Sequence, residues 1–300
     1  MAIISVGTSA TTRVPVQQLS KRRKHSTARW ILHIVLIACA IVMVYPLIWM
    51  IGASLKSDQA IFSNNSLNPF PANLKFDNYV QGWVASGTTF GTFFLNSFLI
   101  CIGAIIGNLI SCSLAAYAFA RMKFKLRGVW FALMLGTLLL PSQVTLVPQY
   151  VFFHALGWTN SILPLIVPKF FGVESFFVFL MIQFIRGIPI ELEQAAMVDG
   201  ASRFQIFSRI ILPLLSPALV TTTIFTFIWT YNDFFGQLIY LSSQSKFTVA
   251  LGLQSFLDAS GESAWGPMFA MTTLSLVPVF LLFVFFQKRL IEGVATTGLK

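Results

Sequence analysis

The sequence predicts an all-α polytopic membrane protein with six transmembrane helices. Of its 300 residues, 56% are hydrophobic and 10% are charged, and the mean hydropathy is +0.78. Soluble domains are typically about 25% charged. Apolar runs of roughly 20 residues, the length that crosses a bilayer, recur along the chain. No polar stretch is long enough to fold as a separate soluble domain.

The apolar runs define the predicted elements in order. The first run is too long for the apolar core of a signal peptide and lacks a small-residue cleavage site, so we interpret it as a retained span. A disordered cytoplasmic tail is expected before it at residues 1–29, and a second cytoplasmic tail at residues 288–300. The predicted spans are about 30–55, 96–120, 129–152, 161–185, 214–240 and 267–287. The long loop after the first span is expected to contain a short amphipathic helix around Asp77–Val84.

The basic residues predict the orientation. Sixteen Lys and Arg residues lie in the two tails, in the 121–127 loop and in the 186–213 loop, whereas the opposite side carries only Lys56, Lys75 and Lys246. Cytoplasmic loops are enriched in Lys and Arg, so both termini are expected to be cytoplasmic. The net charge of +10 is explained by this asymmetry and requires no nucleic-acid partner.

Cysteine and histidine provide no evidence for a disulfide framework or a metal site. The three cysteines fall inside predicted spans at irregular spacing, which is typical of small buried hydrophobes. The three histidines lie far apart in the sequence, without ligand spacing. The motifs H-E-x-x-H and G-x-S-x-G are absent, so an enzyme is not expected.

The 186–213 loop, between spans four and five, predicts a cytoplasmic helix–turn–helix. Glu193 lies near the start of the first helix, where an acid suits the helix dipole. Gly200 is expected to end that helix in a left-handed conformation. Ser202 and Gln205 have the spacing of a capping box, which starts a second helix. Phe204, Phe207 and Ile211 are then expected to line one side of this second helix.

The pattern by itself leaves two interpretations of this loop open. It is either an amphipathic connector on the membrane surface or a knob that fits a cleft on a soluble partner. The loop resembles the EAA motif of ABC importer permeases, in which E-A-A is followed after three residues by G and after nine more by I-x-L-P. The residues that match in register are Ala195, Ala196, Gly200, Ile210, Leu212 and Pro213. Gln194 stands at the motif's Glu position, and Glu193 and Asp199 flank the motif residues.

Other segments resemble the maltose-type carbohydrate branch of these permeases. They are Asn96-Ser97, Leu156–Ser161, Trp229–Phe234, and Phe286–Arg289 with Gly293 and Gly298. The resemblance covers roughly residues 30–300. It identifies the chain as the second, six-span permease subunit of a binding-protein-dependent importer, in the cytoplasmic membrane of a bacterium or archaeon.

The resemblance also implies the partners. A second permease subunit would complete the pathway, an ABC ATPase dimer would grip the coupling loops, and an extracytoplasmic solute-binding protein would deliver a sugar or oligosaccharide. ATP and Mg²⁺ are expected on the ATPase subunits and no cofactor on this chain, which has no G-x-x-x-x-G-K-[ST] phosphate loop. Glycerol phosphate or a polyol is the alternative solute. A self-sufficient secondary transporter or channel is less favoured, because it would not explain the loop.

Polar residues inside the predicted spans are candidates for the translocation pathway. They are Glu174, Trp229, Tyr231, Asn232 and Asp233. Structural pairing or subunit packing is the alternative role for each of them. Lys169 lies five residues before Glu174, which is about 140° of rotation on a helix, so the two are not expected to face each other unless that helix is broken.

Overall fold

The computed structural model describes residues 26–63, 67–71, 73–84, 87–257 and 264–297. The chain divides into two compact units, residues 1–48 and 49–300. The described part of the first unit is a single apolar helical stretch, the beginning of α1 (Ser26–Ala53).

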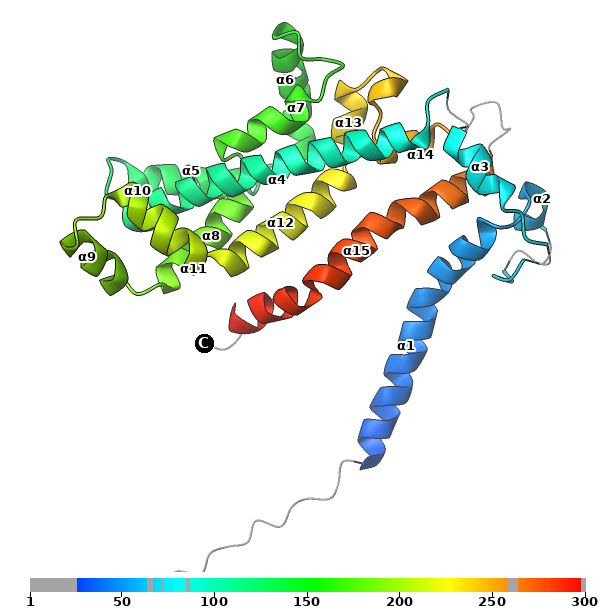
Figure 1. Cartoon of the computed structure of the whole chain (residues 1–300), viewed down its shortest axis with the longest axis horizontal. Coiled ribbons are helices and arrows are strands. Elements are labelled where there is room, and N and C mark those ends of the chain that lie inside the picture. Colours follow the sequence, from blue (N-terminus) through cyan, green and yellow to red (C-terminus); the bar gives the residue numbers. More distant parts are fainter. Residues whose placement is uncertain (1–25, 64–66, 72, 85–86, 258–263, 298–300) are drawn as a thin grey trace, which may run out of the picture. The chain divides into compact units, whose positions relative to one another are not determined.

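The described residues form helices and connecting turns, with no strand among them (Figure 1). After α1 the elements are α2 (Asp58–Ile61), α3 (Asp77–Val84), α4 (Phe90–Arg121), α5 (Arg127–Thr137), α6 (Ser142–Ala155), α7 (Leu163–Ile166), the 3₁₀ turn η1 (Val167–Phe171), α8 (Ser175–Gly187), α9 (Glu191–Val198), α10 (Arg203–Ile206), the π-helical turn η2 (Phe207–Ile211), α11 (Leu212–Leu214), α12 (Ser216–Tyr231), α13 (Phe235–Tyr240), the 3₁₀ turn η3 (Gln244–Lys246), α14 (Val249–Gln254) and α15 (Trp265–Thr297). The short helix expected at Asp77–Val84 is present as α3.

The protein is an all-helical membrane protein, as predicted, but six spans are not confirmed. Four helical stretches among the described residues are long and apolar enough to cross a bilayer, or five if one bent pair counts as a single span. The four are Arg29–Ala53, Phe90–Arg121, Leu163–Gly187 and Trp265–Gln287.

The predicted third span, 129–152, is divided between α5 and α6, with 11 and 14 residues respectively. Pro141 lies at the break and forms the N-cap of α6. Proline has no backbone N–H to donate and disfavours helical geometry in the residue before it, so α5 does not continue through this point. Hydropathy alone does not register this interruption.

The predicted fifth span, 214–240, is also divided. Its main helix, α12, has 16 residues, and Asn232–Phe234 separate it from α13. Together with the helical stretch Arg203–Leu214, α12 is long and apolar enough to cross a bilayer, but the two stretches meet at a bend of 73°. The bend follows Pro213, and Pro217 lies in the first turn of α12.

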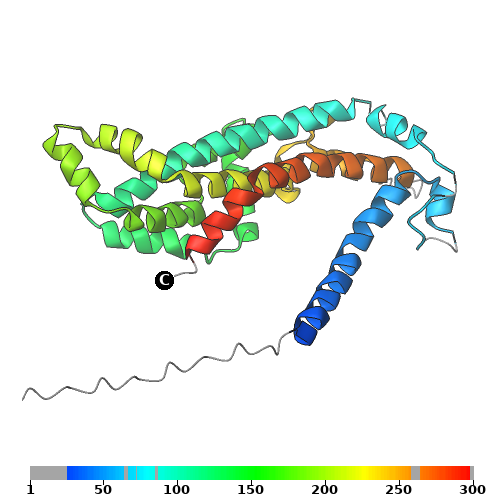
Figure 2. The same cartoon turned by 60° about the horizontal axis from the view of Figure 1, so that its bottom comes forward.

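Helix α4 is the central element of the second unit. It runs beside α12 in both views (Figures 1 and 2) and also packs against α8 and η1. The side of α4 that faces α7 and η1 carries small residues at four-residue spacing. An added Cβ at Gly103 would lie 2.9 Å from the Ile166 side chain, and one at Gly107 would lie 3.0 Å from the carbonyl carbon of Lys169. Small residues at this spacing allow membrane helices to approach closely.

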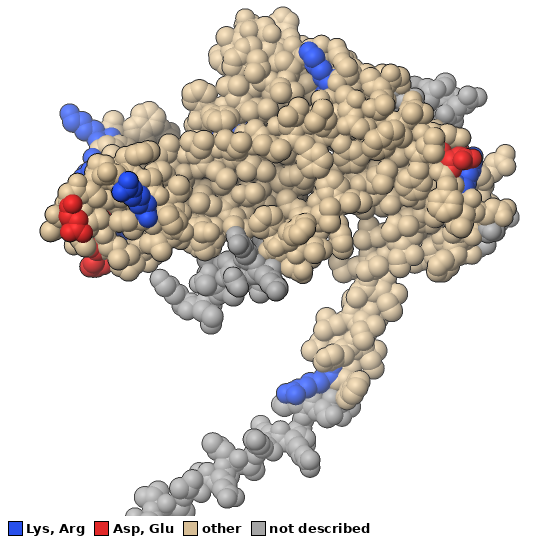
Figure 3. All heavy atoms as spheres, viewed as in Figure 1, with Lys and Arg blue, Asp and Glu red and all other residues tan. Residues whose placement is uncertain are grey.

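Charged side chains gather toward the ends of the second unit. On the face shown in Figure 3, Lys, Arg, Asp and Glu lie around α9–α10 at one end and around α2–α3 at the other, and the surface between them is almost free of charge. This distribution is what a bilayer requires, because an unpaired charge in the hydrocarbon region is expensive.

We expect Gly107→Ala to destabilise the protein by about 1–3 kcal/mol, because the new methyl group would press on the η1 backbone, which cannot rotate away. The matched control is Gly136→Ala in α5, where an added Cβ meets nothing within 4 Å. That control should be neutral or slightly stabilising, since Ala is the better helix former. Thermal unfolding of the detergent-solubilised protein checks both. Equal midpoints for the two variants would contradict the close approach at Gly107.

Candidate functional site

The 186–213 loop folds as two helices joined by a left-handed turn. Gly200, after α9, has a φ of +82°, a conformation that glycine adopts without steric cost. Ser202 and Gln205 form the expected capping box: the Gln205 N–H donates to Ser202 Oγ at 3.3 Å, and the Ser202 N–H donates to Gln205 Oε1 at 2.7 Å. The turn and the cap together fix the path of the chain between α9 and α10.

The second half of the loop is anchored in the protein core. Phe207 and Ile211 are buried in a cluster with residues of α4, α8 and the start of α12. Ile210, Leu212 and Pro213 of the predicted motif follow within η2 and α11. Single π-helical turns such as η2 are frequent at functional sites.

Phe204, which was expected on the same side of this helix as Phe207 and Ile211, differs from them in burial, because its side chain is 71% exposed. Helical periodicity predicts the direction of a side chain, but not whether a neighbouring element lies there.

The first half of the loop is mostly exposed. On α9, Gln194 and Ala195 are exposed, as is Asp199 directly after it, and Ala196 is half-buried against the core cluster. Apolar side chains are exposed here as well: Leu192 and Met197 are nearly half exposed, and Val198 is 88% exposed. Polar Gln194 and apolar Val198 therefore belong to a continuous surface element that makes few contacts within the described chain.

Glu193 differs from the rest of α9, because it is only 4% exposed. Its Oε1 lies 2.6 Å from Nε of Arg121, the last residue of α4. In the sequence, Arg121 was identified only as one of the basic residues that predict the orientation of the chain in the membrane. Nothing in the local pattern indicated a partner more than 70 residues away.

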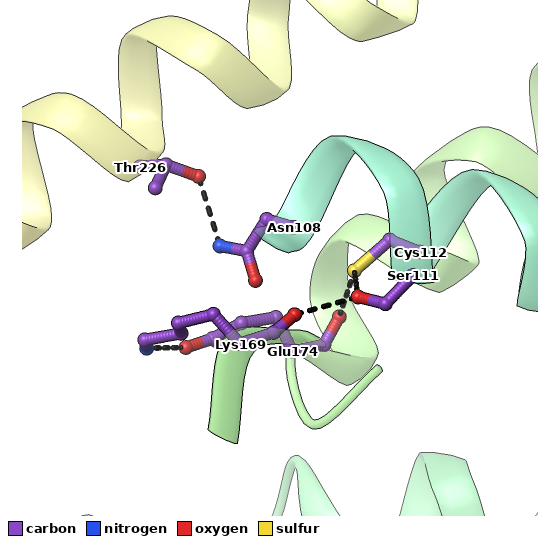
Figure 4. Close-up of polar contacts among 6 residues, drawn as sticks. All are labelled: Asn108, Ser111, Cys112, Lys169, Glu174 and Thr226. Atoms are coloured by element: carbon purple, nitrogen blue, oxygen red, sulfur yellow. Dashed lines mark hydrogen bonds and ion pairs between the residues drawn. The ribbon is translucent and has the colours of Figure 1, made fainter. Parts of the chain in front are cut away.

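The second candidate site lies where the predicted fourth span is interrupted. The 3₁₀ turn η1 ends at Phe171 and is followed by Gly172, which has a φ of +66°, and α8 starts only at Ser175. The interruption brings Lys169 and Glu174 together as an ion pair, each side chain about one quarter exposed (Figure 4). Lys169 and Glu174 were expected to face each other only if the helix was broken, and the structure shows that break.

The backbone at the interruption is supported by α4. Ser111 Oγ donates to the Lys169 carbonyl oxygen at 2.6 Å, and Cys112 Sγ lies 3.9 Å from the Glu174 carbonyl oxygen (Figure 4). One turn earlier on α4, Asn108 Nδ2 donates to Thr226 Oγ1 of α12 at 3.1 Å. Asn108 is 1% exposed, and its Oδ1 has no hydrogen-bond partner among the described residues. A polar seam therefore crosses α4 at the level of the interruption.

The residues singled out in span five divide into two groups. Trp229 is 46% exposed and stacks on Phe177 of α8 with ring centroids 5.1 Å apart. Asn232 is exposed directly after α12, whereas Asp233 accepts a hydrogen bond from the Gly236 N–H at 3.0 Å and so caps the start of α13. Tyr231 is buried, and its hydroxyl donates to the Ser275 carbonyl oxygen of α15 at 3.0 Å.

A cavity of about 410 Å³ lies beside the interruption, between α4, α5 and the Phe170–Val178 segment. Its lining is mostly apolar and includes neither Lys169 nor Glu174. Among the residues that the structure describes, no group of three or more His, Cys, Asp or Glu residues lies close enough to hold a metal ion.

We expect Lys169→Met to destabilise the protein by about 1–3 kcal/mol, because it leaves Glu174 as an unpaired, partly buried charge. Adding Glu174→Gln should recover part of this loss, since neither charge then remains. The double-mutant cycle is measured by thermal unfolding of the detergent-solubilised protein, with Lys123→Met, an exposed lysine, as the control. Strictly additive effects of the two single changes would show that the pair contributes nothing.

Comparisons with known proteins agree with the helical architecture. The family model described as "Binding-protein-dependent transport system inner membrane component" matches residues 107–295. The chain is 31% identical over 281 residues to the arabinooligosaccharides transport system permease protein AraQ of Halalkalibacterium halodurans, covering 93% of this chain and 99% of the relative. It is 32% identical over 279 residues to the trehalose/maltose transport system permease protein MalG of Thermococcus litoralis, with the same coverage of both chains.

A solved structure shares the fold. A chain in the crystal structure of a bacterial ABC transporter involved in the import of the acidic polysaccharide alginate aligns with a TM-score of 0.78 and 21% identity, covering 89% of this chain and 97% of that chain. The family match includes the interrupted fourth span and the whole 186–213 loop. The chain is therefore a multi-pass inner-membrane permease subunit of the binding-protein-dependent ABC transporter family.

Proposed function

We propose that this chain forms, with a second permease subunit, the pathway of an ATP-driven importer, and that a separate ATPase docks on its 186–213 loop. The observation that carries this proposal is the two-sided construction of the loop. Its inner side, through Phe207 and Ile211, is part of the core formed with α4, α8 and α12. Its outer side exposes apolar Val198 and Phe204, which a docked partner would cover.

The proposed topology places this loop in the cytoplasm, with six spans and both termini inside. The basic residues of the 121–127 and 186–213 segments lie together at the α9–α10 end of the second unit. Lys56 and Lys246 lie apart from this end. Asn78 of α3 donates to the Lys56 carbonyl oxygen, and Lys246 belongs to η3, in which Ser245 accepts from Asn96 near the start of α4. The positive-inside rule supports this orientation. The α5–α6 pair, interrupted at Pro141, is the third span in chain order and brings the number of spans in this topology to six.

The docking partner supplies the ATP chemistry. ATP and Mg²⁺ belong to an ABC ATPase dimer in this proposal, because the chain has no phosphate loop of its own. Gln194 is exposed on α9 and presents a neutral amide where the family motif has a carboxylate. It can make only neutral hydrogen bonds to the ATPase, which are weaker than charge-assisted ones. The apolar surface and the Gly200 turn would therefore provide most of the docking energy.

The pathway is proposed to run along the side that carries the interruption of span four. The Lys169–Glu174 pair is partly exposed within a membrane span, so a second permease subunit or a water-filled path must cover it rather than lipid. Trp229, exposed and packed on α8, and Asn232 offer an aromatic face and an amide for a hydroxyl-rich solute. We assign Tyr231 and Asp233 to positioning these two, through the bonds to α15 and α13.

The proposed solute is a sugar or oligosaccharide delivered by an extracytoplasmic solute-binding protein. The support comes from relatives named for arabinooligosaccharides and trehalose/maltose. A relative named for sulfoquinovosyl glycerol keeps a glycerol-containing solute as the second candidate.

Docking is tested by Gly200→Val. A β-branched residue in a left-handed conformation costs about 1–2 kcal/mol or more, so the turn between α9 and α10 should be distorted. We expect the wild-type chain to co-purify with an ATPase and a second permease, and Gly200→Val to lose most of the ATPase while keeping the permease. Gly187→Ala is the control, because an added Cβ there also meets nothing within 4 Å but φ is not positive. Purification of the wild-type chain alone, still transporting solute, would exclude the proposal in favour of a self-sufficient transporter.

The solute class is tested on the cognate solute-binding protein. Isothermal calorimetry against di- and oligosaccharides, glycerol phosphates and polyols should give saturable binding for a saccharide. Binding of a glycerol phosphate or a polyol alone would transfer the assignment to the second candidate. A ligand that is neither a saccharide, a glycerol phosphate nor a polyol, such as an amino acid or a peptide, would exclude both.

A further inference from the structure

Arg121 connects three helices through a single side chain. It is the last residue of α4, and its Nη2 donates to the carbonyl oxygen of Ile185 at 2.7 Å and to that of Ile188. Ile185 lies in the last turn of α8, and Ile188 is the C-cap residue of that helix. The carbonyl groups at the end of a helix lack their usual partner within the helix, and Arg121 donates to two of them. The Ile185 carbonyl oxygen also accepts from the Ile188 N–H, at 3.1 Å. Its Nε meanwhile lies 2.6 Å from Glu193 Oε1 on α9.

The arrangement is enclosed. The side chains of Arg121 and Glu193 are only 9% and 5% exposed, although the surrounding loops are rich in water-exposed charge. Tyr117, one turn earlier on α4, directs its hydroxyl to the other Glu193 oxygen at 3.5 Å. Enclosure makes the pair hard to separate, because either charge left alone would lack both water and a counter-charge.

Glu193 is also the main attachment point of α9. Of the eight residues in this helix, Glu193 is the only one that is buried, and Ala196 is half-buried. The remaining six are exposed. Apart from the chain connections at its two ends, α9 is therefore held to α4 and α8 chiefly by the ion pair with Arg121.

We propose that Arg121 is a positioning residue that latches the coupling helix α9 to the ends of α4 and α8, so that the three move as one body. The inference rests on the proposed function in one respect, namely that α9 is the helix on which the ATPase acts. A flexible contact would allow α9 to tilt alone when the ATPase closes. The latch instead passes that displacement directly into α4, which contacts η1, α8 and α12.

The chemistry of the latch requires arginine. The guanidinium group has five N–H donors in a planar fork and can reach a carboxylate and two carbonyl groups at once. Lysine presents a compact charge on a flexible stem and cannot keep the same three directions. Arg121→Lys therefore keeps the positive charge but loses the planar arrangement of N–H donors. The variant thus distinguishes a positioning role of Arg121 from neutralisation of the Glu193 charge.

The test measures whether α9 and α4 move together. Spin labels are attached at Glu191→Cys on α9 and Lys123→Cys after α4, both exposed positions, with the exposed Cys39 replaced by Ser. The full complex in lipid nanodiscs is measured by pulsed electron paramagnetic resonance without nucleotide and with ATP plus vanadate. We expect one narrow distance distribution in the otherwise wild-type complex, unchanged by ATP plus vanadate. Arg121→Lys should lose the narrow peak and shift when ATP plus vanadate is added.

Two further variants control for charge and folding. Arg127→Lys, in the same loop, removes a guanidinium group whose one hydrogen bond within the described part of the chain goes to the Met122 carbonyl oxygen, at 3.4 Å. This variant should keep the narrow peak. Arg121→Met with Glu193→Met removes both charges and leaves no buried charge unpaired, so this variant should assemble normally and still lose the narrow peak. A narrow, nucleotide-independent distribution in Arg121→Lys and in the double Met variant would overturn the latch. So would a distance in the wild type that changes with ATP plus vanadate.

The retention of the ATPase is recorded on the same samples, so that the two ideas fail separately. If no ATPase is bound to the wild-type complex, docking on the loop is refuted, while the distribution without nucleotide still reports whether Arg121 holds α9. If the ATPase is retained in every variant and the distributions do not differ, docking stands and the latch is refuted.

Discussion

The close approach of the interrupted fourth span to α4 is the constraint on which the middle of the protein depends. A membrane interior offers no water to hydrogen-bond a freed backbone group, so irregular backbone is tolerated only where protein supplies the partners. Gly103 and Gly107 leave room for the α7–η1 segment, and Ser111 continues the same face with a hydroxyl that donates to the Lys169 carbonyl oxygen. Three residues at four-residue spacing thus provide both the space and the hydrogen bond.

The same approach has an electrostatic consequence. Because the helix is interrupted at Gly172, Lys169 and Glu174 neutralise each other instead of facing the membrane singly. The pair nevertheless retains some exposure, and Asn108 close by keeps a buried oxygen without a partner in the described part of the chain. Charges exposed to lipid and buried polar atoms without a hydrogen-bond partner both cost free energy in a membrane protein. The partial exposure of the Lys169–Glu174 pair agrees with a subunit whose surface is completed by other chains of a transporter complex.

The 186–213 loop combines rigidity with an exposed surface. Its turn is specified by Gly200 and the Ser202 capping box, and its second half is anchored by Phe207 and Ile211 in the core. Its first half depends on Glu193, whose buried carboxylate meets Arg121 at the end of α4. The division leaves Gln194, the residue that departs from the family motif, on the outside. The departure therefore changes the surface offered to a partner and leaves the internal attachment of the helix unaltered.

The sequence by itself determined the features that depend on composition and local geometry. Apolar content and run length were sufficient for an all-helical membrane protein, and the spacing of Gly200, Ser202 and Gln205 was sufficient for the helix–turn–helix. Hydropathy averages over backbone irregularities, which is why the breaks at Pro141 and Asn232 were overlooked within predicted spans. Only the tertiary structure decided which side chains meet. Arg121 and Glu193, or Ser111 and Lys169, are separated by more than 50 residues, and their pairing depends on how α4 packs against α8, a relation that no local periodicity encodes.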